Sequence, residues 1–394
     1  MLVLNLIDAA SPQARGTTLA LMAAAQDRLG DHVSQRTLLL GGTELARSAA
    51  QAGLCEATVL STPGGRAEWG WPAARWHLRG HNVRPDLVHA WSVRSLMLGL
   101  LLYPRTPRVL TLTLVPQRPV VHWLRWFVAE APGPTVLLPI SNTIRRELLS
   151  GGVAESAVHV LRPGLDLGRV PHTQRPTLRS QWGWGAAPER HTVVALLSDP
   201  PEATDVLPAM MAAGLACEVA ATGGGRVHLL VHPRQTHRLR ARRVARGIGK
   251  PDNLIDEPRL DRPWEILPAC DAALTLGPHG GGLSLLWAMA AGVPIVAQAS
   301  YAVSEIVEDR HSALLTRPGS AATLARRLGQ ILADPGSART LADTARHEAF
   351  SYFSRQRYGR ALATVYGQIL AGQPVAVPPL EITGGLRFQG TGGS

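Results

Sequence analysis

The sequence predicts an α/β protein built from two doubly wound, Rossmann-like parallel sheets. Its 394 residues exceed what one compact hydrophobic core usually holds, so two domains are expected. Short apolar runs of strand length alternate with segments of helical apolar spacing, as a parallel sheet with crossover helices requires. This alternation stops once, over residues 171–190, and then resumes. Two βα arrays in tandem therefore imply two doubly wound sheets.

The first array opens with an apolar run at residues 2–7, which predicts a buried strand that ends near Asp8. Residues 17–29 carry leucine, methionine and alanine at helical spacing ahead of Gly30, so a helix is predicted there. Further strands of this half are predicted at residues 37–40, 87–90, 109–112 and 136–140.

The interruption at residues 171–190 is rich in Pro and Gly and has no sustained apolar period. We interpret it as the linker between an N-terminal domain, residues 1–170, and a C-terminal domain, residues 191–372. Strands of the second domain are predicted at residues 193–197, 227–231, 271–276 and 294–297, and helices at 206–213, 236–246, 283–291, 321–332, 338–349 and 355–371. The Pro- and Gly-rich residues 373–394 are predicted to form a disordered tail.

The composition is that of a folded protein, because hydrophobic residues make up 45% of the chain and charged residues only 18%. Arginine carries the net charge of +11, since Lys250 is the only lysine. A positive field attracts anionic partners, but a GC-rich coding sequence explains the bias more simply. The basic residues 232–246 lack neighbouring aromatic residues, so a solvated helix face is favoured over nucleic-acid binding.

Three widely spaced cysteines, Cys55, Cys217 and Cys270, indicate neither a zinc site nor a disulfide framework, which fits the reducing cytoplasm. The N-terminus lacks signal-peptide features, and the apolar run at residues 96–103 is too short to cross a bilayer. Aromatic and basic residues occur together near 69–79 and 120–129, as they do in segments that rest on the inner membrane face. Core packing of the aromatic residues is the favoured interpretation, and peripheral membrane contact is the alternative.

Residues 282–297, GLSLLWAMAAGVPIVA, combine a glycine turn, an apolar helix and a Gly-Val-Pro turn into a strand. The segments SEIVED at 304–309 and ALLTRPG at 313–319 follow in order. Together they resemble the donor-domain signature of family 4 glycosyltransferases. The free amides at the start of such a helix can hold a diphosphate. Weaker matches in the same order extend the resemblance: RPDLVHA at 84–90, PISN at 139–142, VLRPGLD at 160–166 and residues 266–276.

The resemblance implies a GT-B fold, in which the two domains face each other across a cleft and the helix at 355–371 crosses back to the N-terminal domain. It also implies a retaining transferase that moves a sugar from a nucleotide donor to a carbohydrate or lipid-linked acceptor. Neither a metal nor a cofactor is implied. Nucleic acid is disfavoured as a partner.

Several positions depart from the family's donor site. The two glutamates that family members place with seven residues between them, near the donor sugar and the ribose, are His279 and Trp287 here. Trp287 offers one N–H donor and cannot accept two ribose hydroxyls, so a glutamate substituted there is expected to strengthen nucleotide binding. The pyrophosphate-binding Arg and Lys align with Leu197 and Glu202.

The donor-binding residues that remain are expected to be the backbone amides of a glycine turn and helix start, with Glu305 as a nucleotide contact or a cap of the next helix. The glycines are explained equally well by a turn that needs positive φ. The full donor set is His279, Gly280, Gly281, Gly282, Leu283, Ser284, Trp287 and Glu305.

A diphosphate needs more positive charge than helix-end amides supply, so a replacement arginine is expected to reach the site. The acceptor or phosphate side is expected to include Arg15, Gly16, Thr113 and Arg162. Thr113 stands where the family often has a histidine and cannot act as an acid or base near neutral pH, so no catalytic residue is assigned. Two hypotheses stay open: an active retaining glycosyltransferase, and an inactive member that serves as a binding or scaffold protein.

Overall fold

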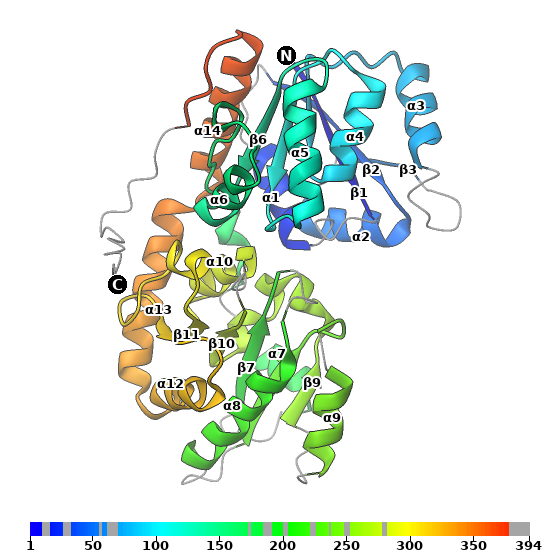
Figure 1. Cartoon of the computed structure of the whole chain (residues 1–394). Coiled ribbons are helices and arrows are strands. Elements are labelled where there is room, and N and C mark those ends of the chain that lie inside the picture. The colour runs from blue at the N-terminus through cyan, green and yellow to red at the C-terminus, as the bar shows by residue number, and fades with distance from the viewer. Residues whose placement is uncertain are drawn as a thin grey trace, which may run out of the picture.

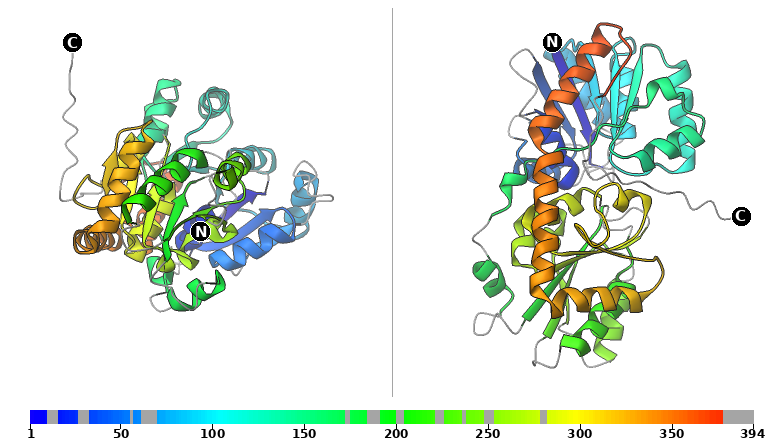
Figure 2. Two further views of the ribbon diagram at one scale, coloured as in Figure 1. Left: turned by 90° about the horizontal axis from the view of Figure 1, so that it is seen from below. Right: turned by 90° about the vertical axis from the view of Figure 1, so that its left-hand side faces the viewer.

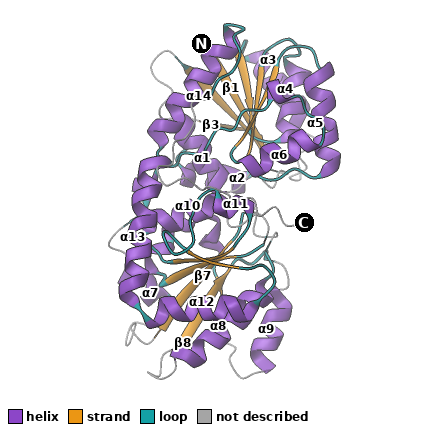
Figure 3. Cartoon of the chain, turned by 60° about the vertical axis from the view of Figure 1, so that its left-hand side comes forward, coloured by secondary structure: helices purple, strands orange, loops and turns teal. Residues whose placement is uncertain are grey.

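The computed structural model describes residues 1–9, 16–26, 33–54, 57–60, 70–171, 175–183, 191–199, 204–220, 226–235, 238–247, 253–277 and 282–377. These residues form two six-stranded parallel sheets, one above the other in Figure 1. Helices lie on both faces of each sheet (Figure 3). The predicted fold class is confirmed.

The N-terminal sheet has the strand order β3-β2-β1-β4-β5-β6. Its strands are β1 (Leu2–Asp8), β2 (Ser34–Leu40), β3 (Ala57–Leu60), β4 (Leu87–Ala90), β5 (Arg108–Leu112) and β6 (Thr135–Pro139). The helices of this half are α1 (Gly16–Gln26), α2 (Thr43–Ala52), α3 (Gly70–Gly80), α4 (Val93–Leu102), α5 (Arg118–Glu130) and α6 (Asn142–Ser150). Alternate residues of β1 pack into cores on opposite faces of the sheet, as in Val3 and Leu4, so both faces are covered.

The C-terminal sheet has the order β12-β11-β10-β7-β8-β9. Its strands are β7 (His191–Leu197), β8 (Arg226–Val231), β9 (Leu254–Asp256), β10 (Ala272–Thr275), β11 (Ile295–Gln298) and β12 (Leu314–Thr316). Its helices are α7 (Arg175–Gln181), α8 (Val206–Ala220), α9 (Arg238–Gly247), α10 (Gly282–Ala291), α11 (Tyr301–Ser304), α12 (Ala321–Ala333) and α13 (Pro335–Tyr352). Short 3₁₀ helices, among them η9 (Pro258–Asp261) and η10 (Pro263–Glu265), lead into β10. The strand order reverses beside β1 and β7, which is where doubly wound sheets bind ligands, at the carboxyl ends of the strands.

The last helix, α14 (Arg355–Leu370), leaves α13 and runs along the N-terminal half (Figure 2). Leu165 and Ser354 form a parallel bridge at the crossing. Gly164 is required there because a Cβ at this position would lie 2.4 Å from the carbonyl oxygen of Ser354. Residues 373–377 follow the helix, and Ala376 N donates to Gln368 Oε1, so the segment beyond α14 begins as ordered chain.

A buried polar cluster holds α14 against the N-terminal sheet. His89 on β4 is fully buried, and its ring nitrogens lie 2.5 Å from Tyr366 Oη and 2.8 Å from Thr111 Oγ1. Trp91 stacks on the His89 ring and donates its N–H to Asn5. Burial lowers the pKa of His89 to about 3, so the ring is neutral in the folded protein.

Two differences from the sequence expectations have local causes. The strands β3, β9 and β12 were not predicted, because they are short strands at sheet edges, where partial exposure removes the need for a continuous apolar run. The predicted linker at 171–190 contains α7, whose Arg179 donates to Ala269 O and pairs with Asp271 of the C-terminal domain. Most of the predicted tail, residues 378–394, lies outside the described residues.

The aromatic residues near 69–79 and 120–129, for which membrane contact was the alternative to core packing, divide between the core and the surface. On α5, Leu124 and Phe127 are fully buried, as core packing predicts, whereas Trp126 is 51% exposed. Trp76 on α3 is 80% exposed, so the core interpretation is wrong for it. Among the described helices, none combines the length and hydrophobicity needed to cross a bilayer.

Candidate functional site between the two domains

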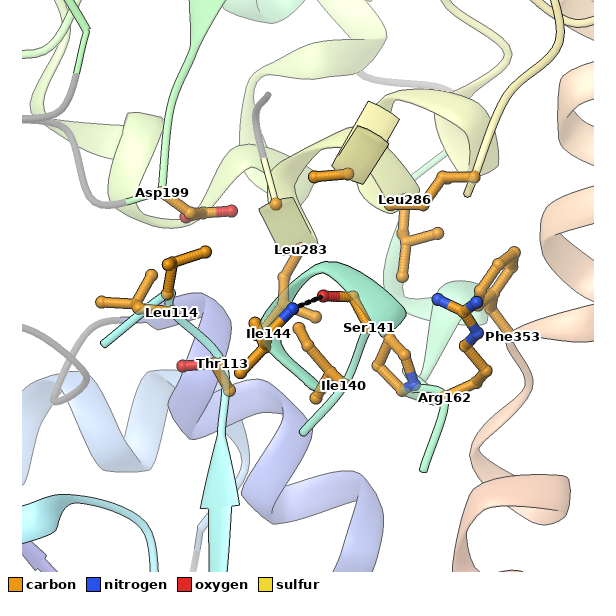
Figure 4. Close-up of a pocket in the computed structure, with 15 residues that line it drawn as sticks. Thr113, Leu114, Ile140, Ser141, Ile144, Arg162, Asp199, Leu283, Leu286 and Phe353 are labelled. Atoms are coloured by element: carbon orange, nitrogen blue, oxygen red, sulfur yellow. Dashed lines mark hydrogen bonds between the residues drawn. The ribbon is translucent and has the colours of Figure 1, made fainter. Parts of the chain in front are cut away.

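A pocket lies where the carboxyl ends of both sheets meet. The N-terminal domain contributes Thr113, Ile144 and Arg162, and the C-terminal domain contributes Gly282 and Leu283 at the start of α10 (Figure 4). Leu286 and Phe353 complete an apolar wall. The pocket holds only about 50 Å³, whereas small-molecule sites commonly hold about 300 to 1,000 Å³. The pocket is therefore smaller than a typical small-molecule site.

Arg162 reaches this pocket from the segment that precedes the domain crossing (Figure 4). The structure thus places in the pocket one of the two arginines expected there. Its Nη1 lies 2.5 Å from Glu305 Oε2, and both side chains are mostly buried, at 15% and 13% exposed. Its charge is consequently balanced by the chain's own carboxylate.

Glu305 joins the two domains. Its Oε2 accepts from Asn142 N at 2.7 Å, and its Oε1 accepts from Thr143 N at 2.8 Å. These amides are the first two of α6, so Glu305 caps a helix of the opposite domain rather than the helix that follows it in sequence. A carboxylate at a helix N-terminus is favoured by the helix dipole as well as by the hydrogen bonds.

A second carboxylate occupies the start of α10. Asp199, two residues beyond the end of β7, accepts from Ser284 N through Oδ2 at 2.5 Å. Its Oδ1 accepts from Thr17 Oγ1 of α1, across the domain boundary, at 3.0 Å. Burial of the carboxyl raises its pKa to about 6, with the nearby Asp261 adding to the shift and the hydrogen bonds from Ser284 and Thr17 opposing it.

Gly16 allows the close approach of the two domains, and Gly282 allows Asp199 to approach α10 within the C-terminal domain. A Cβ on Gly16, the first residue of α1, would lie 2.2 Å from the carbonyl oxygen of Asp261 in the C-terminal domain. Gly282 has φ of +48°, and a Cβ there would lie 2.9 Å from Cβ of Asp199. Both glycines therefore have steric reasons that need no ligand.

Thr113 lines the pocket from the end of the β5 segment, and its hydroxyl lies 3.4 Å from that of Thr18. It is buried and next to a second hydroxyl, so it can position a polar group by hydrogen bonding.

Trp287 does not line the pocket. Its side chain is fully buried, with its ring centroid 4.8 Å from that of Trp264 on η10. The indole Nε1 has no hydrogen-bond partner among the described residues. Leu197, at the family's arginine position, is also buried. Both side chains are part of the core. The structure therefore does not place Trp287 where it could face a nucleotide in the pocket.

Other expected site residues lie outside the described residues: Arg15, Glu202, His279, Gly280 and Gly281. Asp199 is the site residue that sequence reasoning missed. The signal for it was its position just after a predicted strand at the switch point of the sheet, because such positions carry ligand-facing side chains in doubly wound folds.

Removing the Glu305 carboxylate should destabilise the closed arrangement of the domains. In Glu305→Ala, Arg162 keeps a mostly buried charge without its partner, and two α6 amides lose their acceptor. Breaking a buried pair commonly costs about 3 to 5 kcal/mol, and the residual solvent exposure lowers our expectation to about 2 to 3 kcal/mol. Urea denaturation measures this loss, with Glu155→Ala, at an exposed ion pair with Arg145, as the control. Equal urea midpoints for Glu305→Ala and Glu155→Ala would contradict this expectation.

Comparisons with known proteins agree with this geometry. Two facing Rossmann-like domains, with a pocket between them and a last helix that crosses back, define the GT-B class of fold. The family "Glycosyltransferase Family 4" matches residues 16–169, and the family "Glycosyl transferases group 1" matches residues 235–348. The chain belongs to the family 4 glycosyltransferases. No curated protein sequence matches it significantly.

Solved structures share the fold over almost the whole chain. HepE of Anabaena, in complex with UDP and glucose, has 16% sequence identity and a TM-score of 0.72, covering 93% of this chain and 100% of its own. Sucrose-phosphate synthase of Thermosynechococcus elongatus has 14% identity and a TM-score of 0.68, covering 95% and 100%. WaaG, a glycosyltransferase involved in lipopolysaccharide biosynthesis, has 17% identity and a TM-score of 0.64, covering 94% and 100%.

Proposed function

We propose that this protein transfers a sugar from a nucleotide donor to an acceptor, with retention, in the pocket between its domains. The observation that carries the proposal is the Ser284 amide, which already holds an anionic group at 2.5 Å at the start of α10. A donor phosphate has the same hydrogen-bonding needs as that carboxylate. Arg162 lines the same pocket and supplies a cation close by.

On this proposal the donor binds on the α10 side, and the acceptor binds near Thr113 and Ile144 of the N-terminal domain. The apolar wall that Leu286 and Phe353 add suits a carbohydrate acceptor attached to a lipid or another apolar group. Since the closed pocket is too small for a nucleotide sugar, domain opening is part of the catalytic cycle.

A thermal-unfolding screen with UDP, GDP, ADP and UDP-glucose tests the proposal. One nucleotide should stabilise the protein by about 2.7 kcal/mol at 100 times its dissociation constant. Arg162→Gln should weaken this effect, whereas Arg145→Gln, at a partly exposed arginine on α6 that does not line the pocket, should preserve it. Release of UDP from UDP-glucose in the presence of candidate acceptors then measures transfer. A wild-type protein that none of the four ligands stabilises would count against the proposal.

The second candidate function is a binding protein without transferase activity. The observation that favours it is buried Trp287, which leaves the family's ribose position without a carboxylate. Stabilisation by a nucleotide together with no consumption of any nucleotide sugar, across an acceptor panel, would support this candidate over the first.

A further inference from the structure

We propose that Asp199 is a built-in competitor for the donor's anionic group, and that its carboxylate must leave the start of α10 before the donor can bind. This inference rests on the proposed function and assigns a regulatory role to a residue of the same pocket. It concerns the chain's own side chain rather than an additional ligand.

The first support is direct occupancy. Asp199 Oδ2 accepts from Ser284 N at 2.5 Å, which uses one of the free amides that a donor phosphate would need. The carboxylate side chain also packs on the helix start, since a Cβ on Gly282 would come within 2.9 Å of its Cβ. A phosphate and this carboxylate cannot take the same position.

The second support is that occupancy is coupled to closure. The other carboxylate oxygen accepts from Thr17 of α1, in the opposite domain, at 3.0 Å. Gly16, next to Thr17, is in close contact with the Asp261 backbone. Asp199 therefore holds α10 and α1 together across the domain boundary.

The third support is the local charge balance. Asp261 adds to the raised pKa of Asp199, so acidic charge surrounds the carboxylate at the start of α10. Arg162, which lines the same pocket, is already paired with Glu305. A diphosphate beside Asp199 would be repelled by its negative charge, and the Arg162 charge would already be balanced by Glu305. Displacement of the Asp199 carboxylate is therefore the favourable route.

Asp199→Asn tests the proposal because it removes the charge and keeps the shape. Isothermal titration calorimetry of the full chain with UDP and with pyrophosphate should show at least about tenfold tighter binding than for the wild type, a change of about 1.4 kcal/mol. Thr17→Val, which keeps the carboxylate and removes only its contact across the boundary, should give a smaller gain in the same direction.

Asp334→Asn is the matched control. Asp334 also accepts from a helix N-terminal amide, Ser337 N at 3.0 Å, but at the exposed start of α13. The net charge therefore changes as in Asp199→Asn, and the affinity should stay the same. Measurable binding that is equal or weaker in Asp199→Asn would overturn the competitor role alone. Absence of binding in all four proteins would overturn the proposed donor site and the competitor role with it.

Discussion

Trp287→Glu should lower the free energy of unfolding by at least about 5 kcal/mol and should not strengthen nucleotide binding. Loss of a buried Trp commonly costs about 3 to 5 kcal/mol, and an unpaired buried carboxylate adds to that. Trp287 is fully buried against Trp264, so the new carboxyl would enter the core rather than the pocket. The sequence alone led to the opposite expectation, because it could not show which way position 287 faces.

Urea denaturation with calorimetry on any folded fraction checks this result. Trp287→Phe is the control, because it keeps an aromatic ring and removes an N–H that has no partner among the described residues. Its cost should be about 1 to 2 kcal/mol. A folded Trp287→Glu protein that binds UDP more tightly than the wild type would show that residue 287 faces the donor.

The contribution of His89 to the stability of the protein should fall as the pH is lowered from about 6.5 toward 3. Burial lowers the pKa of His89 to about 3, whereas an unfolded histidine titrates near 6.5. Between these values the unfolded chain binds the extra proton, so the contribution is complete above about pH 6.5 and is lost at about 1.4 kcal/mol per pH unit below it. The full change is about 5 kcal/mol.

Asp199 contributes with the opposite sign. Its pKa is raised to about 6, so the folded protein holds the extra proton above the ordinary aspartate value, and this contribution is lost as the pH rises through 6. The His89 effect is therefore isolated by comparing pH series of urea midpoints for the wild type and His89→Gln. His122→Gln, at an exposed position on α5, is the control. Parallel pH series for the wild type and His89→Gln would contradict the assignment.

The sequence predicted the strands that are both apolar and flanked by turn residues, such as β4 and β8. It also predicted that the start of α10 would lie in the site, since a glycine turn before an apolar helix has a local pattern. Contacts that join distant parts of the chain left no such pattern. Thr17 and Asp199 are 182 positions apart, and their hydrogen bond depends on how two domains close. Glu305 finds its helix N-terminus 163 positions away for the same reason.

The return of α14 has a consequence for how the chain is made. Tyr358 and Tyr366 are fully buried against the first domain, and Tyr366 supplies a partner for His89. A ribosome releases these residues only after it has synthesised the whole second domain. The first domain must therefore wait, with the docking surface of α14 open to water, until the second domain has been translated. Chaperone contacts during synthesis should concentrate on that surface, and protein truncated before Arg355 should be degraded rather than accumulate as a folded N-terminal half.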